Sequence, residues 1–274
     1  MGHWSGDHRY GLYPQHMSGL HKETLSRCTR DKKIELEVTT VKEFTKTIGQ
    51  IVAEDYRTAK VFEDHGIDFC CGGKVALSTT CLEKGIDLAM LTGELEAVKS
   101  KPFEKSQNFS SFELPFLIDY IINVHHNYIK ENAGQIAKYA YTIAEVHGAR
   151  HPEVVEIAAI FDTLAADLAV HLKEEEDHFF PVIKRFDRDR KAGAIPADED
   201  TLIIKNSLEK LILEHEQAGD AIHTIRRLAK GYTIPEDVCN TFVITYQRLK
   251  EFEDDLHKHV HLENNILFLK AGQP

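Results

Sequence analysis

The sequence predicts an all-α protein: a small helical N-terminal domain followed by an up-and-down four-helix bundle. Apolar residues recur at helical spacing along most of the chain, and Gly- and Pro-containing breaks separate the periodic stretches. In the second half, four histidines on these apolar stripes lie 45, 44 and 44 residues apart. They are His126, His171, His215 and His259. Such even spacing is expected when each of four consecutive antiparallel helices contributes one residue near its middle.

Composition narrows the class of protein. The 274 residues are 42% hydrophobic, which is enough for one or two globular domains. With 33 basic and 44 acidic residues the net charge is −11, which argues against nucleic acid or an anionic membrane as a partner. The chain has neither a long apolar stretch nor the apolar core of a signal peptide, so we expect a cytoplasmic protein. Five scattered cysteines do not resemble a disulfide framework, and we expect reduced thiols.

The first third of the chain predicts an extension, a small domain and a linker. Residues 1–37 lack a periodic apolar face and are expected to be poorly ordered. Residues 38–98 are expected to form the small helical domain, in which one helix over 48–65 stops at Gly66. Residues 99–111 are polar, include a proline and show no periodicity, which is typical of a linker.

The bundle is expected over residues 112–270. Breaks at 148–152, 192–197 and 231–235 are short enough to join antiparallel neighbours. Pro181 falls inside the second helical pattern and should kink or end that helix, because proline lacks the N–H needed for the backbone hydrogen bond.

The apolar stripe of the fourth helix runs through a histidine and a glutamate. The series Leu249, Phe252, Leu256, His259, Glu263, Ile266 advances in steps of three and four residues. His259 and Glu263 therefore face the bundle core. His257 and His261 also lie four residues apart, but their offset of two residues turns them by about 200°. We expect these two histidines on a solvated face.

The second helix repeats this pattern with His171 and Glu175, again one helical turn apart. Each His-Glu pair can present a nitrogen and a carboxylate to one point. A lone histidine on an apolar stripe is more often an ordinary core residue. Four at one level with two carboxylates would be very costly to bury unpaired, and metal ions would compensate them. The mixed nitrogen and oxygen donors suit iron or manganese better than structural zinc.

A Cys-Cys-Gly-Gly-Lys segment in the small domain is the second candidate site. Buried cysteines in small helical domains are often inert. Here Lys74 and a helix start should favour the thiolate, so we expect Cys70 and Cys71 to act in redox chemistry, nitrosyl binding or iron handling. A disulfide between adjacent cysteines would be strained and is not expected. The remaining cysteines receive no functional interpretation: Cys28, Cys81 and Cys239.

These motifs resemble those of the hemerythrin-like proteins, and specifically the RIC family (repair of iron centres, the iron–sulfur cluster repair di-iron proteins). The segment Asp68-Phe69-Cys70-Cys71-Gly72-Gly73-Lys74 matches the N-terminal signature of that family. Its metal pattern matches His126, His171, Glu175, His215, His259 and Glu263. The usual Leu-Phe-Pro after the last ligand reads Leu267-Phe268-Leu269 here.

Oxygen-carrying hemerythrins resemble this chain less, because they have a fifth histidine one turn after the ligand on the third helix. In this chain that place, one turn after His215, is Gly219. Glycine cannot bind a metal, so we expect an open coordination position or a small cavity there.

The resemblance implies a cytoplasmic stress-response protein with two non-haem iron ions, bridged by carboxylates and an oxo group. It implies repair of iron–sulfur clusters damaged by nitric oxide or peroxide, through iron donation. The partners would be damaged iron–sulfur proteins, with nitric oxide or O2 as small ligands. Two alternatives stay open: an enzyme that reduces nitric oxide to nitrous oxide at the di-iron centre, and a sensor of O2 or nitric oxide. The oligomeric state, a homodimer included, is also left open.

Overall fold

The computed structural model describes residues 46–101 and 108–272, and within these ranges the chain is helical apart from loops and one isolated bridge between Thr47 and Ala76. The all-α prediction is confirmed. Residues 1–45, with the predicted extension and Cys28, lie outside the described residues, as do residues 102–107 of the predicted linker. None of the described helices is long and apolar enough to cross a membrane.

The described part of the small domain contains four short helices: α2 (Ile48–Glu54), α3 (Ala59–Asp64), α4 (Leu77–Lys84) and α5 (Leu88–Lys99). The single helix predicted over 48–65 is wrong, because Asp55 interrupts it with an extended backbone. Its side chain accepts a hydrogen bond from the Arg57 N–H and begins a separate turn. Gly66 and Gly85 follow α3 and α4 with φ of 62° and 65°, the left-handed conformation that suits glycine after a helix.

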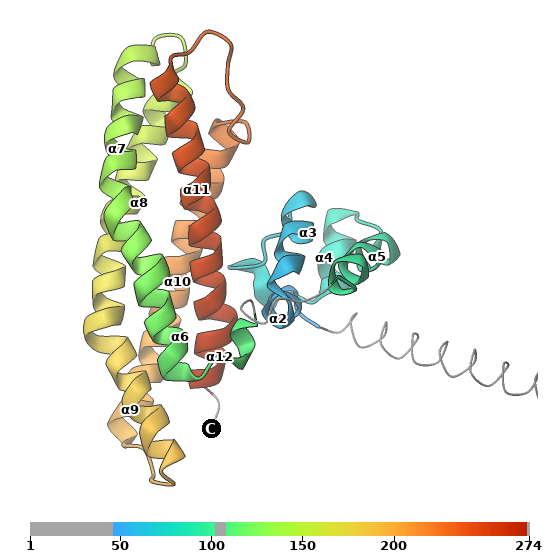
Figure 1. Ribbon diagram of the computed structural model, residues 1–274, viewed down its shortest axis with the longest axis vertical. Coiled ribbons are helices and arrows are strands. Elements are labelled where there is room, and N and C mark those ends of the chain that lie inside the picture. The colour runs from blue at the N-terminus through green and yellow to red at the C-terminus, as the bar shows by residue number, and fades with distance from the viewer. Residues whose placement is uncertain (1–45, 102–107, 273–274) are drawn as a thin grey trace, which may run out of the picture. The chain divides into compact units, whose positions relative to one another are not determined.

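Four long helical segments of the described chain form the bundle (Figure 1). The first comprises α6 (Leu114–Tyr120), the π-helical turn η5 (Ile121–His126) and α7 (Asn127–His147). The second comprises α8 (Glu153–Glu174), the π-helical turn η6 (Glu175–Phe179) and α9 (Phe180–Lys191). The third is α10 (Asp198–Leu228). The fourth comprises α11 (Asn240–Leu262), the π-helical turn η7 (Glu263–Leu267) and α12 (Phe268–Ala271). Helix α7 packs on α8 and α11, and α10 packs on the same two helices.

The connections follow the predicted breaks, with two differences. The second segment continues through Pro181, which lies in the first turn of α9 directly after η6. The start of a helix tolerates proline, because an N–H there needs no intrahelical partner. The third connection is longer than predicted and spans 229–239, where Lys230 and Tyr232 have φ of 51° and 63°.

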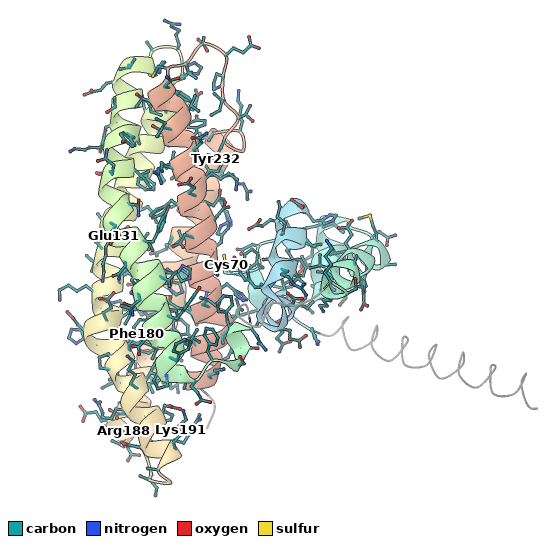
Figure 2. All side chains as sticks on the ribbon, in the orientation of Figure 1. Cys70, Glu131, Phe180, Arg188, Lys191 and Tyr232 are labelled. Atoms are coloured by element: carbon teal, nitrogen blue, oxygen red, sulfur yellow. The ribbon has the colours of Figure 1, made fainter. Side chains whose placement is uncertain are left out.

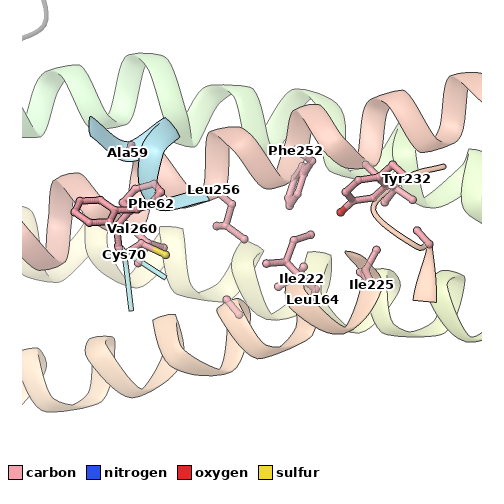
Figure 3. Packing of buried hydrophobic residues seen from close by; sticks show 14 of the residues in the cluster. Ala59, Phe62, Cys70, Leu164, Ile222, Ile225, Tyr232, Phe252, Leu256 and Val260 are labelled. Carbon is pink, nitrogen blue, oxygen red and sulfur yellow. The ribbon is translucent and has the colours of Figure 1, made fainter. Parts of the chain in front are cut away.

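Two hydrophobic clusters fill the described part of the molecule. One joins the small helices to the half of the bundle that contains Tyr232, and Figure 3 shows Phe62 and Cys70 beside Leu256 and Val260 of α11. The other fills the opposite half around α6, α9 and α12 and includes Phe180 (Figure 2). On every bundle segment the predicted metal ligands fall between residues of the first cluster and residues of the second. The polar layer therefore separates two apolar cores.

Candidate metal centre

The structure brings the six residues predicted from the apolar stripes into two overlapping groups. One consists of His126, Glu175, His259 and Glu263, and the other of His171, Glu175, His215 and Glu263. Within each group all ligand atoms lie within 4.8 Å of one another, and all six residues are buried. Both glutamates belong to both groups, so they lie between two histidine pairs.

The ring nitrogens within each histidine pair face each other. Nε2 of His126 lies 3.1 Å from Nε2 of His259, and Nε2 of His171 lies 3.0 Å from Nε2 of His215. Two nitrogens that bind one ion at about 2.0–2.1 Å and at right angles are about 3 Å apart. Glu263 reaches both pairs, since its carboxylate oxygens lie 3.1 Å from Nε2 of His259 and of His215. These separations fit one ion for each pair.

The two carboxylates provide a second test of fit. Both oxygens of Glu175 and of Glu263 are buried without a hydrogen-bond partner. Burial, and then the charge of Glu263, raises the pKa of Glu175 well above its ordinary value. Burial acts in the same direction on Glu263, but attraction to His259 holds its pKa well below the ordinary range. Unpaired buried carboxylates are costly, and bound cations would relieve that cost.

In three of the histidines, Nδ1 makes a hydrogen bond to a side-chain oxygen. The partner is Glu176 for His126 at 2.7 Å, Glu214 for His171 at 2.7 Å, and Asn264 for His215 at 2.9 Å. Such a contact fixes the ring and leaves Nε2 free for a metal. Sequence reasoning missed these three supporting residues. Each is the immediate neighbour of a predicted ligand, a signal that could have identified them.

Burial lowers the pKa of two of the histidines, which favours their neutral form. The pKa of His259 is lowered to about 3, mainly because its ring is removed from water. Burial, followed by repulsion from His215, also lowers the pKa of His171. A neutral imidazole offers the lone pair that a metal ion requires. The site is therefore prepared to bind cations at neutral pH.

Three bundle segments change to π-helical geometry where they reach the centre. His126 is the last residue of η5, Glu175 is the first of η6 and Glu263 is the first of η7. Isolated π-helical turns are rare and often occur at functional sites. The spacing of four residues between histidine and glutamate did not reveal them, because it also fits an uninterrupted α-helix.

The predicted solvated face of α11 is wrong, because His257 and His261 are buried. The ring of Phe69 packs against both, with centroid distances of 6.1 Å to His257 and 5.7 Å to His261. The ring of Tyr56 also packs against His261, with a centroid distance of 5.8 Å. The face that turns away from the bundle core is therefore covered by the small helical domain.

The expected thiolate is also wrong for Cys70. Its side chain is buried, and its Sγ donates a hydrogen bond of 3.1 Å to the Asp68 carboxylate. The contact with Cys71, then burial and the charge of Asp68, raises the pKa of Cys70 well above its ordinary value. Lys74 is exposed and does not offset these effects. Both cysteines are free thiols with their sulfur atoms 3.8 Å apart, and Cys71 is half-buried.

The position opposite Gly219 is not open as expected. Cys71 Sγ lies 3.3 Å from the backbone carbonyl oxygen of His215. A Cβ atom at Gly219 would approach that sulfur to 2.9 Å. The glycine thus makes room for the Cys71 thiol one turn after a predicted ligand, and the two candidate sites of the sequence meet there.

A separate cavity of about 670 Å³ lies between α8 and α10. Its lining is mainly apolar, including Ile160, Leu164 and Leu168, and it reaches His171 and His215. Small molecules can approach that histidine pair by this route. The other pair, His126 and His259, is completely buried.

Comparison with known families agrees with this architecture. Residues 117–271 match the family described as the hemerythrin HHE cation binding domain. Residues 44–99 match a family named for the N-terminal part of ScdA and described as a domain of unknown function.

Characterised relatives match along most of the chain. The iron–sulfur cluster repair protein ScdA of Staphylococcus epidermidis is 30% identical over 226 residues, covering 82% of this chain and 97% of the relative. The iron–sulfur cluster repair protein YtfE of Yersinia pestis is also 30% identical over 226 residues, covering 82% and 96%. ScdA of Staphylococcus haemolyticus is 29% identical over 223 residues, covering 81% and 96%. The chain thus belongs to the RIC family of iron–sulfur cluster repair proteins, in which a Cys-Cys domain is joined to a hemerythrin-like cation-binding bundle.

Proposed function

We propose that this protein holds a di-iron centre and repairs iron–sulfur clusters damaged by nitrosative or oxidative stress, acting in the cytoplasm as an iron donor. The observation that carries the proposal is the pair of buried glutamates without hydrogen-bond partners between two facing histidine pairs. Membership of the family supports the repair activity, since the relatives are named for it. Damaged iron–sulfur proteins are the proposed partners.

The ligand set divides into two halves. His126 and His259 would hold one iron and His171 and His215 the other, with Glu175, Glu263 and an oxo group as bridges. When bound, the centre supplies releasable iron and one-electron redox chemistry. The carboxylates can take up a proton or shift, which would loosen a metal, while the supported histidines keep their orientation.

The two histidine pairs differ in access, and this favours one as the donor. His171 and His215 line the cavity between α8 and α10, whereas His126 and His259 are completely buried. We therefore propose that iron is released from the His171 and His215 side. Cys71 lies against the backbone of His215, which supports the proposal that this thiol receives iron, reduces it or traps a nitrosyl group.

Nitric oxide reduction is the less favoured function. That reaction would need an open coordination position, such as the one expected at Gly219, and the Cys71 thiol occupies that space. Nitric oxide and O2 remain proposed small ligands, for which the apolar cavity is a suitable route.

The test is a repair assay on a dehydratase whose iron–sulfur cluster has been damaged by nitric oxide. The iron-loaded protein should restore dehydratase activity in proportion to the iron added, without repeated formation of nitrous oxide. The double variant Cys70→Ser with Cys71→Ser should keep its iron, because the proposed ligands contain no sulfur, yet repair less at matched iron loading. Repeated nitrous oxide formation without dehydratase recovery would favour the enzyme instead.

A further inference from the structure

A second group of potential metal ligands lies outside the di-iron ligand set. His223 of α10 and Glu253 and His257 of α11 place one ligand atom each within 4.8 Å of one another. On α11, His257 Nε2 lies 3.9 Å from a Glu253 oxygen, one helical turn away. The rings of His223 and His257 face each other across the two helices at a centroid distance of 5.4 Å.

Three polar atoms of this group lack hydrogen bonds although they are buried. Glu253 is completely buried and neither of its carboxylate oxygens has a hydrogen-bond partner, and the same holds for Nε2 of His257. The nearby cation is Arg226, whose Nη1 lies 3.5 Å from Glu253 Oε1 and whose side chain is 39% exposed. The Tyr232 hydroxyl also acts on this carboxylate, although it makes no hydrogen bond of normal geometry. Arg226 and Tyr232 therefore compensate the buried carboxylate only in part.

The group is also accessible from solvent. His223, His257 and Arg226 line a cavity of about 420 Å³, and its opposite wall includes Asp68 and Cys70. A hydrated ion entering the cavity would meet both imidazole rings first, with the Glu253 carboxylate behind them. The oxygen and sulfur of the opposite wall offer further donors.

We propose that His223, Glu253 and His257 bind a divalent transition-metal ion at a site separate from the di-iron centre. Two imidazoles and one carboxylate, with remaining positions open to solvent, are a donor set that takes ferrous iron or zinc. The site does not depend on the proposed repair activity.

The experiment titrates the iron-loaded full chain with Co²⁺, whose visible absorption reports nitrogen and oxygen ligands. We expect one Co²⁺ per chain in addition to unchanged iron, and loss of this absorption in His257→Ala. Arg226→Gln should bind Co²⁺ several-fold more tightly, because it removes a positive charge beside Glu253. His178→Ala, which changes an exposed histidine of η6 rather than this group, is the matched control and should bind as the unchanged chain does.

Several outcomes would overturn the proposal. Co²⁺ that only displaces iron, or that still binds to His257→Ala, would place the ion elsewhere. Weaker binding in Arg226→Gln would mean that the cluster is only an ion pair. If His257→Ala does not fold, the Arg226→Gln titration alone decides. Since the readout is cobalt binding rather than repair, failure here leaves the proposed function standing, and failure of repair leaves this site standing.

Discussion

At the scale of single residues, Glu175 and Glu263 have unlike electrostatic environments although both belong to the two groups of potential ligands. Attraction to His259 keeps the pKa of Glu263 low, whereas burial and the neighbouring carboxylate raise that of Glu175. Glu175 is therefore the less favourable of the two charges to bury when metal is absent. With metal bound, the same charge is needed to bind it.

Glu175→Gln should consequently change stability in opposite directions with and without metal. The variant is expected to lose most of its iron, measured as iron per chain and as the visible spectrum. Its metal-free form should resist urea better than the metal-free parent, by about 1 kcal/mol or more, because Glu175 must bury a charge or take up a proton on folding, whereas glutamine does neither. Equal destabilisation of both forms would mean that Glu175 is a structural residue rather than a ligand.

The side chains that make hydrogen bonds to Nδ1 of the histidines provide a second test of the metal centre. Glu176 holds Nδ1 of His126 and is itself held by Lys130 at 2.5 and 2.7 Å. Glu176→Gln should weaken iron binding by about 10- to 100-fold, since the ring loses a charged support. Glu174→Gln, two residues earlier and paired with Lys210, is the control and should bind iron normally. Competition with a chelator of known affinity measures both variants.

How much the sequence could predict is clearest from α11. Helical phase correctly assigned His259 and Glu263 to the bundle core, because that prediction needs only the period of the helix. The same helical phase predicted that His257 and His261 face solvent, and this prediction is wrong. Periodicity shows which side faces the bundle axis, but another domain of the chain covers the opposite side. The contacts of Phe69 depend on tertiary packing that no local pattern encodes.

At the scale of secondary-structure elements, the loop that carries Cys70 and Cys71 is fitted to α10 and η7. Asn265 of η7 donates its amide to the backbone oxygens of Phe69 and Cys70, at 3.2 and 3.4 Å. Asn264 reaches Cys70 as well as the ring of His215, so one residue contacts both the cysteine loop and a proposed ligand. A movement of this loop would therefore change the positions of residues at the metal centre.

The contact between this loop and α10 can be measured with a double-mutant cycle. Gly219→Ala alone gains helix propensity of about 1 kcal/mol but forces its Cβ against Cys71 Sγ. In the Cys71→Ala background the sulfur is absent, so the same substitution should stabilise the protein. Urea unfolding of the four proteins should give a coupling of about 1 kcal/mol or more. Strict additivity would show that the thiol does not lie against Gly219 in solution.

At the scale of the whole molecule, one hydrophobic cluster includes residues of both the small domain and the bundle. All six proposed ligands nevertheless lie in the bundle. We therefore expect iron binding to need only the bundle, and stability to depend on both parts of the chain. The small domain covers His257 and His261 without supplying a ligand to the di-iron group.

A fragment of residues 110–274 tests this separation. It should fold and bind about two irons, because every proposed ligand is retained. It should also unfold at a lower urea concentration than the full chain, since Val260 and His261 lose the apolar side chains of the small domain that cover them. Iron per chain and the urea midpoint are the two measurements. A fragment that folds but cannot retain iron would show that the small domain takes part in the metal site.

The π-helical turns determine where the bundle can tolerate a change in chain length. A π-helical turn contains one residue more than the α-helical turn it replaces. Because each turn still completes one rotation, deleting one residue from η6 or η7 would restore a regular α-helix and leave the phase of the helix beyond it almost unchanged. The apolar side chains of α9 or α12 would then stay in the second core, and the change would be confined to the level of the metal centre. These two segments can therefore accept the loss of one residue, whereas the same deletion in α10, which passes this level as a continuous α-helix, would rotate everything beyond it by about 100°.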